Sequence, residues 1–150
     1  MHAEKILYPT DFSTANEAGL AMATALARGT GAKLIILHVE EPPMQYGAGE
    51  MYYGIPNPDT AEVQSMLKAI KPTDDSVVCE HRLVTGDPAS EIVRVAEEED
   101  VDLIVLGTHG RTGLKRLLMG SVAEAVVRRA ACPVISFKPG DKAIKWVMDD

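Results

Sequence analysis

Long apolar runs and clusters of positive charge are both missing from this sequence. No apolar run approaches the ~20 residues that a membrane-spanning helix needs. Lys and Arg are scattered along a chain whose formal net charge is −7, whereas sequence-independent binding of DNA or RNA requires a clustered basic face. We therefore expect neither a membrane nor a nucleic acid as a partner of this protein.

Cysteine is scarce and histidine is scattered, which argues against disulfide frameworks and metal centres. The two cysteines, Cys79 and Cys132, form no Cys-x-x-Cys pair, and we interpret them as buried, reduced thiols. The four histidines lack the spacing of metal ligands, and we interpret His38, inside an apolar run, as a structural residue. The first residues contain no apolar signal core, so we expect a cytoplasmic protein with no metal bound by its side chains.

Several motifs of known chemistry are also absent. The chain contains no G-x-x-x-x-G-K-[ST] phosphate loop and no G-x-G-x-x-G after its first predicted strand. It contains no G-x-S-x-G nucleophile elbow either. The sequence therefore lacks these signatures of nucleotide-hydrolysing, dinucleotide-binding and ester-hydrolysing enzymes, and we assign no catalytic residue.

What the sequence does contain is a regular alternation of strand-like and helix-like segments. Short apolar runs such as Lys33–Val39 are typical of strands covered on both faces of a parallel sheet. Between them, apolar residues recur at helical spacing, with Asp87–Pro88 as a helix start and Gly29 and Gly31 as a helix end. The alternation predicts one α/β domain over residues 1–150, with a doubly wound parallel sheet and helices on both faces. The predicted strands span residues 5–9, 33–39, 77–84, 101–106 and 133–137, and the predicted helices begin after Ser13–Thr14, at Thr60, after Asp87 and at Ser121.

Two segments, residues 40–59 and 139–150, are harder to place. Residues 40–59 are rich in Pro, Gly and Tyr, which indicates a long exposed loop. That loop either covers a ligand or a partner, or is a variable surface loop. The helix that follows, over residues 60–71, is expected to bury one apolar face. The residues of that face are Val63, Met66, Leu67 and Ile70.

Polar and glycine residues gather at the ends of two predicted strands. The first strand ends in Pro9-Thr10-Asp11, and the fourth ends in Leu106 and runs into Gly107-Thr-His109-Gly110. In an open parallel sheet, ligands collect beyond the carboxyl ends of the strands, where the strand order reverses. If the order is 3-2-1-4-5, these two strand ends are neighbours at the reversal and face one crevice.

The stretch from Gly107 to Ser121 has the composition of a phosphate-binding loop. Gly107 and Gly110 remove side chains where a ligand would approach the backbone. Gly120 and Ser121 fall at a predicted helix start, where free N–H groups and the helix dipole favour an anion. The Ser121 hydroxyl can also donate to a phosphate oxygen, and His109 could touch a ligand. Positive charge nearby comes from Arg111, Lys115 and Arg116.

Each of these features also has an ordinary structural explanation. Glycines after a strand are often turn formers, and Ser121 could be only an N-cap. Asp11 could cap a helix, His109 could make a loop hydrogen bond, and the cations could be solvated. Together, at two adjacent strand ends, the features favour an anion-binding crevice.

The spacing Gly107-x2-Gly110-x9-Gly120-Ser121 matches the G-x2-G-x9-G-[ST] signature of ATP-binding universal stress proteins. The opening Ile-Leu-Tyr-Pro-Thr-Asp-Phe-Ser resembles the first strand of that family and its adenine-side aspartate. Blocks such as Leu-Ile-Ile-Leu-His-Val and Asp-Leu-Ile-Val-Leu-Gly are also similar, so the resemblance covers residues 3–138. The segments at 40–59 and 139–150 fall outside the shared pattern.

The resemblance implies a five-stranded sheet of order 3-2-1-4-5 with ATP, or ADP or AMP, in the crevice. Asp11 and Val39 would meet adenine, Gly107 would lie against ribose, and Gly110 with Gly120–Ser121 would meet the phosphates. A Mg or Mn ion would be coordinated through the phosphates. The full set of expected nucleotide-binding residues is Pro9, Thr10, Asp11, Val39, Leu106, Gly107, His109, Gly110, Arg111, Gly120, Ser121 and Val122.

The last predicted strand, Pro133–Phe137, is expected to form a dimer edge. It would lie at the margin of the sheet, and an exposed apolar edge invites pairing with another chain. Members of the resembled family commonly form homodimers through this strand, and a two-fold axis would make the pairing antiparallel. The alternative is that Ile144, Trp146 and Val147 of the tail cover the edge.

Three functions compete at this point. The first is an ATP-binding regulator or switch in the stress response, in which bound nucleotide favours a conformer that an unknown protein partner recognises. The second is a slow ATPase or phosphotransferase, for which His109 is the one sequence-near candidate base. The third is a structural dimer with a vestigial loop, which the intact Gly110, Gly120 and Ser121 argue against.

Overall fold

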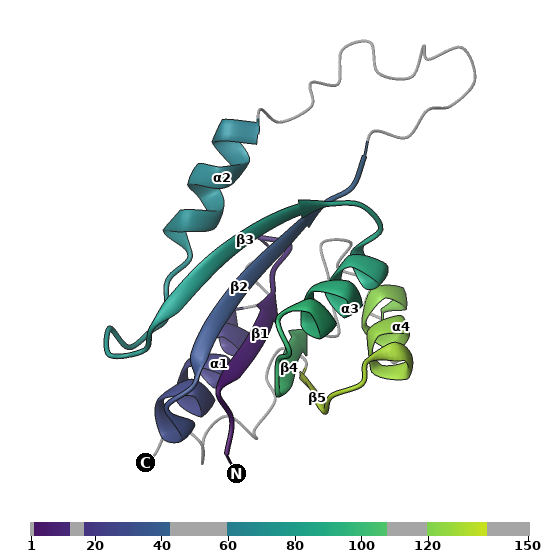
Figure 1. Cartoon of the computed structure of the whole chain (residues 1–150). Helices are drawn as coiled ribbons and strands as arrows, with labels where there is room; N and C mark the ends of the chain where they lie inside the picture. Colours follow the sequence, from purple (N-terminus) through teal and green to yellow (C-terminus); the bar gives the residue numbers. More distant parts are fainter. Residues whose placement is uncertain (1, 13–16, 43–59, 108–119, 138–150) are drawn as a thin grey trace, which may run out of the picture.

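The computed structural model describes residues 2–12, 17–42, 60–107 and 120–137, and within them strands and helices alternate along the chain (Figure 1). The strands are β1 (Lys5–Pro9), β2 (Lys33–Glu40), β3 (Cys79–Thr85), β4 (Leu103–Gly107) and β5 (Val134–Phe137). The helices are α1 (Glu17–Thr30), α2 (Thr60–Ala69), α3 (Pro88–Glu98) and α4 (Ser121–Arg129). The predicted segments at 13–14, 43–59, 108–119 and 138–150 lie outside the described residues.

The strands form one parallel sheet of order β3-β2-β1-β4-β5. This confirms the predicted doubly wound α/β fold and its strand order. Short apolar strands joined through helices favour this result, because parallel strands need crossovers that cover both faces. At the amino ends of β1 and β4, the Asp102 carboxylate accepts hydrogen bonds from the backbone N–H groups of Glu4 at 2.8 Å and Lys5 at 3.2 Å. These bonds hold the two central strands in register.

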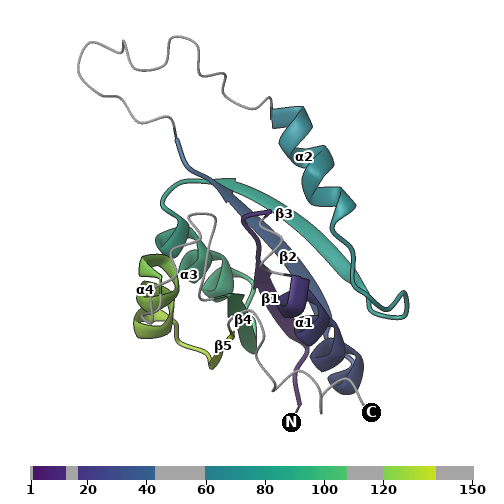
Figure 2. The same cartoon turned by 180° about the vertical axis from the view of Figure 1, so that it is seen from behind.

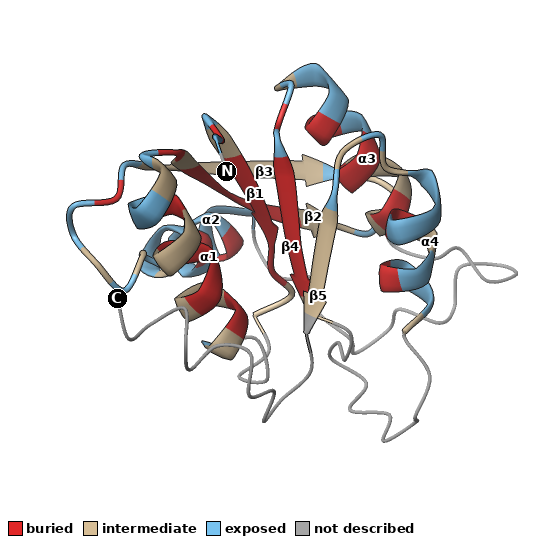
Figure 3. Cartoon of the chain, turned by 90° about the horizontal axis from the view of Figure 1, so that it is seen from below, coloured by how far each residue is buried: buried red, intermediate tan, exposed pale blue. Residues whose placement is uncertain are grey.

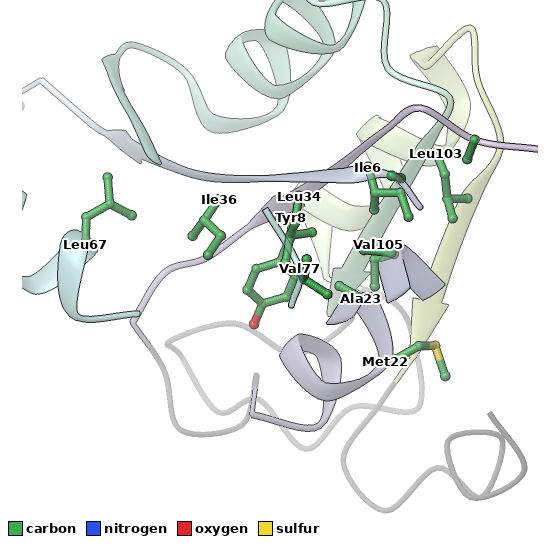
Figure 4. Packing of buried hydrophobic residues seen from close by; sticks show 13 residues of the cluster. Ile6, Tyr8, Met22, Ala23, Leu34, Ile36, Leu67, Val77, Leu103 and Val105 are labelled. Atoms are coloured by element: carbon green, nitrogen blue, oxygen red, sulfur yellow. The ribbon is translucent and has the colours of Figure 1, made fainter. Parts of the chain in front are cut away.

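Helices α1 and α2 cover one face of the sheet and α3 and α4 the other (Figure 2), with a cluster of buried apolar side chains on each face. Residues of β1 alternate between them, so Ile6 and Tyr8 pack toward α1 and α2 while Leu7 packs toward α3 and α4. Figure 4 shows Tyr8, Ala23 and Val105 in the layer between the sheet and α1. The central strands are consequently buried, as the red of β1 and β4 shows in Figure 3.

The end of α1 differs from the prediction in one respect. The helix continues through Gly29 to Thr30, and only Gly31, with φ +78°, adopts the left-handed conformation that stops it. The Ala27 carbonyl accepts from the N–H groups of Gly31 at 2.8 Å and Ala32 at 3.0 Å, which satisfies the helix end. The expectation that Gly29 also terminates the helix is therefore wrong, because its backbone is still helical.

Helix α2 buries a narrower face than expected. Val63 and Leu67 are buried and Ile70 is half-buried, but Met66 is 45% exposed. This helix packs on β2 and β3, at the margin of the sheet, where there is less surface to cover a wide apolar stripe. The prediction for Met66 was wrong for that reason.

Other local expectations are met or adjusted by the structure. Asp87 caps α3, with its carboxylate accepting from the N–H of Ser90 at 3.0 Å, and Pro88 is the first helical residue as predicted. Cys79 and Cys132 are free thiols but half-buried rather than buried. No helix within the described ranges combines the length and apolarity needed to cross a membrane.

Candidate functional site

The carboxyl ends of β1 and β4 lie side by side where the strand order reverses. From β1 the chain continues to β2 and β3 on one side, and then returns to β4 on the other. Leu7 pairs with Ile104 in the parallel register, so Thr10, after β1, and Gly107, at the end of β4, lie at the same edge of the sheet. The two strand ends that the sequence marked as chemically unusual are therefore neighbours.

The base of the site is apolar and belongs to the core. Pro9 is buried and pairs with Leu37 of β2, and Leu106 is only 5% exposed. Val39, near the end of β2, is half-buried and packs at the margin of the layer that faces α3 and α4. These side chains make the strand ends apolar beneath the turn that follows β1.

The turn after β1 carries Asp11 at the carboxyl edge of the sheet. Thr10 is buried, and its N–H donates to the Leu37 carbonyl at 2.8 Å, which continues the sheet by one residue. Its hydroxyl oxygen accepts from the N–H of Phe12 at 3.1 Å. Phe12 has φ +67°, a conformation that is uncommon for a bulky residue and that recurs at functional sites. Asp11, between them, is half-exposed.

The Asp11 carboxylate affects a buried side chain, that of Tyr8. Burial, and to a smaller extent the Asp11 carboxylate, raises the pKa of Tyr8 far above its usual range. Tyr8 therefore remains a neutral phenol at physiological pH. On the face toward α1 and α2, the side chain nearest in sequence to the Asp11 turn in the buried layer is thus uncharged.

His38 supports the same turn from β2. Its ring is buried, its Nδ1 lies 2.8 Å from the Thr10 carbonyl oxygen, and its ring centroid lies 4.2 Å from that of Phe12. This agrees with the structural role inferred from the sequence. The sequence did not show which segment His38 holds; the structure shows that it is the turn that carries Asp11. The one signal in the sequence was a polar residue near the end of an otherwise apolar strand.

The start of α4 supplies the second half of the site. Because β4 and β5 are parallel, the helix between them runs back along the sheet, and Figure 3 shows it starting on the side toward which the arrows of β4 and β5 point. Gly120 is the N-cap, with extended backbone, and its carbonyl accepts from the N–H of Glu124 at 2.9 Å. Ser121 and Val122 are exposed residues of the first turn. The alternative that Ser121 is the N-cap is therefore ruled out.

This first turn suits an anion. Gly120 has no side chain to accept from the first N–H groups of the helix, so the N-cap residue itself does not occupy these donors. Arg128 and Arg129 occupy the last turn of α4, where positive charge suits the helix dipole.

Three of the expected nucleotide-binding residues, His109, Gly110 and Arg111, lie outside the described residues. Among the residues that are described, no group of three or more His, Cys, Asp or Glu side chains could hold a metal ion.

Hydrogen-bond acceptors and hydrogen-bond donors are both present at one edge of the sheet. At β1 and β2, a carboxylate at the rim of an apolar surface can accept hydrogen bonds from an amine or a hydroxyl. At α4, backbone N–H groups can donate to an anion. A ligand that is a flat, amine-bearing ring at one end and anionic at the other satisfies both.

Comparison with known proteins identifies the family of this chain. The family model described as the universal stress protein family matches residues 2–138. Universal stress protein MJ0577 of Methanocaldococcus jannaschii is 33% identical over an alignment of 153 residues that covers 90% of this chain and 94% of the relative. The solved structure of MJ0577 superposes with a TM-score of 0.78 at 34% identity and covers 95% of this chain and 100% of that chain.

Two further solved structures contain nucleotides. A universal stress protein in complex with cAMP is 28% identical, with a TM-score of 0.62, over 93% of this chain and 100% of that chain. The universal stress protein of Archaeoglobus fulgidus in complex with dAMP is 26% identical, with a TM-score of 0.67, over 92% of this chain and 100% of that chain. The family match spans all of the described strands and helices, and the chain belongs to the universal stress protein family.

Proposed function

We propose that this protein binds an adenine nucleotide, ATP in the first place, at the carboxyl edge of the sheet and acts as a nucleotide-dependent switch in the stress response. One observation carries the proposal. The turn bearing Asp11 follows β1 and Gly107 ends β4, so both lie at the carboxyl edge of two neighbouring strands where the strand order reverses, and α4 starts at the same edge. The cAMP and dAMP complexes of two family members support the same class of ligand.

The adenosine end of the nucleotide would occupy the β1–β2 side. Asp11 accepts from the exocyclic amine of adenine or from a ribose hydroxyl, and half-buried Val39 offers the ring an apolar contact. Pro9 and Leu106 close the core beneath, and Thr10 holds the turn. Gly107, at the carboxyl end of β4, lets ribose approach the backbone because it has no side chain.

The phosphates would occupy the start of α4. Gly120 leaves the N–H groups of the first turn without a side-chain acceptor of its own, and the exposed Ser121 adds a hydroxyl donor. Val122 contributes its backbone N–H in the same turn. His109, Gly110 and Arg111, outside the described residues, complete the proposed set. A Mg or Mn ion would bind through the phosphate oxygens rather than through protein carboxylates.

We keep binding, rather than catalysis, as the proposed function. A slow ATPase or phosphotransferase needs a base near the phosphates, and the one candidate from the sequence, His109, lies outside the described residues. Asp11 is proposed for the opposite end of the nucleotide. Single-turnover hydrolysis of bound ATP separates the two functions, because a switch leaves the nucleotide intact over the time of binding.

The proposed output of the switch is a homodimer that a protein partner recognises. β5 is the last strand of the sheet and has only β4 beside it within the described part of the chain, so its other edge has main-chain groups to offer. Val134 and Ile135 on this strand are half-buried, and the adjoining α4 exposes Val127 at 44%. A two-fold axis through this edge would bury these residues against their copies.

Isothermal titration with ATP and GTP tests the binding proposal. We expect ATP to bind more tightly than GTP, and Asp11→Ala to reduce that preference. Losing a hydrogen bond to a charged acceptor lowers affinity by roughly tenfold or more. Asp75→Ala, at an exposed residue remote from the strand ends, is the matched control and should behave as wild type. Equal wild-type affinity for both nucleotides would refute the adenine assignment.

The phosphate half of the site is tested separately. Gly120→Val places a β-branched side chain where a phosphate must approach the backbone, and we expect ATP binding to be lost while the circular dichroism spectrum is kept. Gly29→Val is the control, because an added Cβ at Gly29 meets no atom within 4 Å. A Gly120→Val protein that binds ATP as wild type does would place the phosphates elsewhere.

A further inference from the structure

Both peptide units that flank Asp11 are held by hydrogen bonds from outside Asp11 itself. The Thr10 carbonyl belongs to the peptide that joins Thr10 to Asp11, and it lies 2.8 Å from His38 Nδ1. The Phe12 N–H belongs to the peptide that joins Asp11 to Phe12, and it donates to the Thr10 hydroxyl oxygen at 3.1 Å. The backbone of Asp11 is thereby fixed on its two sides.

The hydrogen bond from His38 defines the state of its ring. A carbonyl oxygen can only accept, so Nδ1 at 2.8 Å must carry the hydrogen. The ring is 8% exposed, and the Phe12 ring packs on it with centroids 4.2 Å apart and planes inclined by 36°. Burial and ring packing leave the imidazole little freedom to turn away from the Thr10 carbonyl.

The same contacts maintain an unusual backbone. Phe12 has φ +67°, which is costly for an aromatic residue and persists only where the surroundings impose it. Its ring contact with His38, its N–H bond to the Thr10 hydroxyl and its packing against the core support this conformation. The hydrogen bond between His38 and the Thr10 carbonyl is the contact from a neighbouring strand that acts on the peptide next to Asp11.

We propose that His38 is a positioning residue for base selection: it aims the Asp11 carboxylate by holding the Thr10–Asp11 peptide, without touching the nucleotide itself. This inference rests on the proposed function. Discrimination between two bases depends on a donor and an acceptor meeting within hydrogen-bond geometry, so a turn that is free to move loses selectivity. Overall affinity falls less, because the phosphates are held at α4.

A pair of amide substitutions tests this geometry. In His38→Asn the side-chain nitrogen occupies nearly the place of Nδ1 and can still donate to the Thr10 carbonyl. In His38→Gln the nitrogen lies one bond further out, near the place of Nε2, and misses it. We expect the ratio of the GTP and ATP dissociation constants to stay near the wild-type value in His38→Asn. In His38→Gln we expect the ratio to fall by roughly tenfold, toward one.

His81 offers a matched control on the neighbouring strand. Its Nε2 lies 2.7 Å from the Ile70 carbonyl oxygen, so it makes the same kind of bond, but to the segment after α2. His81→Asn withdraws the donor from that carbonyl. We expect His81→Asn to lower the midpoint of thermal unfolding and to leave the ratio of the GTP and ATP dissociation constants unchanged. This control separates a loss of stability from a misplacement of the Asp11 carboxylate.

A second pair acts on the other flanking peptide and does not depend on the folding of the His38 variants. Thr10→Val removes the oxygen that holds the Phe12 N–H, and Thr10→Ser keeps it. We expect the ratio to fall in Thr10→Val and to be retained in Thr10→Ser.

The outcomes separate the two proposals. A folded His38→Gln protein with the wild-type ratio, or a Thr10→Val protein with that ratio, overturns the positioning role and leaves nucleotide binding intact. Equal loss in His38→Asn and His38→Gln also overturns it, because the position of the nitrogen would then not matter. A wild-type protein that binds no adenine nucleotide, or binds ATP and GTP equally, overturns the proposed function and this inference with it.

Discussion

Two neighbouring glycines at the end of α1 are predicted to respond in opposite directions to the same substitution. Gly29 is the penultimate residue of the helix and Gly31 follows it with φ +78°. An added Cβ meets no atom within 4 Å at either position, so sterics with the rest of the protein play no part. The difference lies in the backbone conformation alone.

The magnitudes follow from that conformation. Gly29→Ala replaces glycine in a helix and should stabilise the protein by about 0.5 kcal/mol, near the low end because the site is close to the helix end. Gly31→Ala forces alanine into the left-handed region, which costs about 1–2 kcal/mol and is offset in part by the stiffer unfolded chain. We expect a net loss of about 1 kcal/mol.

Thermal unfolding followed by far-ultraviolet circular dichroism measures both. For a chain of this length 1 kcal/mol corresponds to roughly 2–4 °C in Tm. Gly31→Ala should therefore lower Tm by roughly 2–4 °C, and Gly29→Ala should raise it by roughly 1–2 °C. The three proteins are compared at one concentration, so that any association contributes equally. Two shifts of the same sign would refute the assignment of the helix end to Gly31.

Three other predictions concern the cap of α3, the core and the β5 edge. Asp87→Ala should cost about 1 kcal/mol because it removes the helix cap. Hydrogen bonds from Ser90 hold the pKa of Asp87 below its usual range, so this stability is present above the unfolded pKa and is lost as the pH falls below about 4. Asp87→Asn should keep the cap without that pH dependence, and a pH-independent difference between wild type and Asp87→Asn would contradict this. Val126→Ala should cost about 2 kcal/mol because Val126 is fully buried, and Val78→Ala, at a residue 66% exposed before β3 and at the opposite edge of the sheet from β5, should cost little; equal costs in denaturant titrations would argue against the described burial of Val126. Wild type should sediment as a dimer at micromolar concentration and Ile135→Lys as a monomer whose fold is checked by circular dichroism, because Ile135 also packs partly against the core. A monomeric wild type would leave the tail as the cover of β5.

The centre of the sheet could be predicted from the sequence because β1, β2 and β4 are short and predominantly apolar. Residues 33–39 and 101–106 have no polar alternation, and only a strand covered on both faces accommodates that pattern. The Asp87–Pro88 pair marked a helix start by chemistry that acts within three residues. Local signals of this kind do not depend on the rest of the fold. The strand order was taken from the family resemblance rather than from the periodicity.

Features set by tertiary contacts were beyond the sequence. Gly29 and Gly31 look alike in a sequence, but only one of them adopts a positive φ. The exposure of Met66 depends on how much of the sheet α2 covers, which the helical period does not show.

The position of the candidate site could be predicted from the sequence, but the contacts that hold its residues in place could not. The two strand ends were identified because special residues follow apolar runs, and the fold brings them together at the reversal. The contact between His38 and the Thr10 carbonyl joins residues 28 apart in sequence and depends on the orientation of a ring. The left-handed backbone of Phe12 likewise has no sequence signal.

The central claim is that an adenine nucleotide binds at the carboxyl edge of the sheet between β1 and β4. Titration of ¹⁵N-labelled protein with ATP, followed by the shifts of assigned backbone amides, tests the place of binding directly. The account predicts saturable shifts that are largest at Asp11, Gly107 and Gly120, with little change at Glu4 and Asp102 near the opposite edge. Shifts that are absent, or that are largest at the amino edge of the sheet, would contradict it.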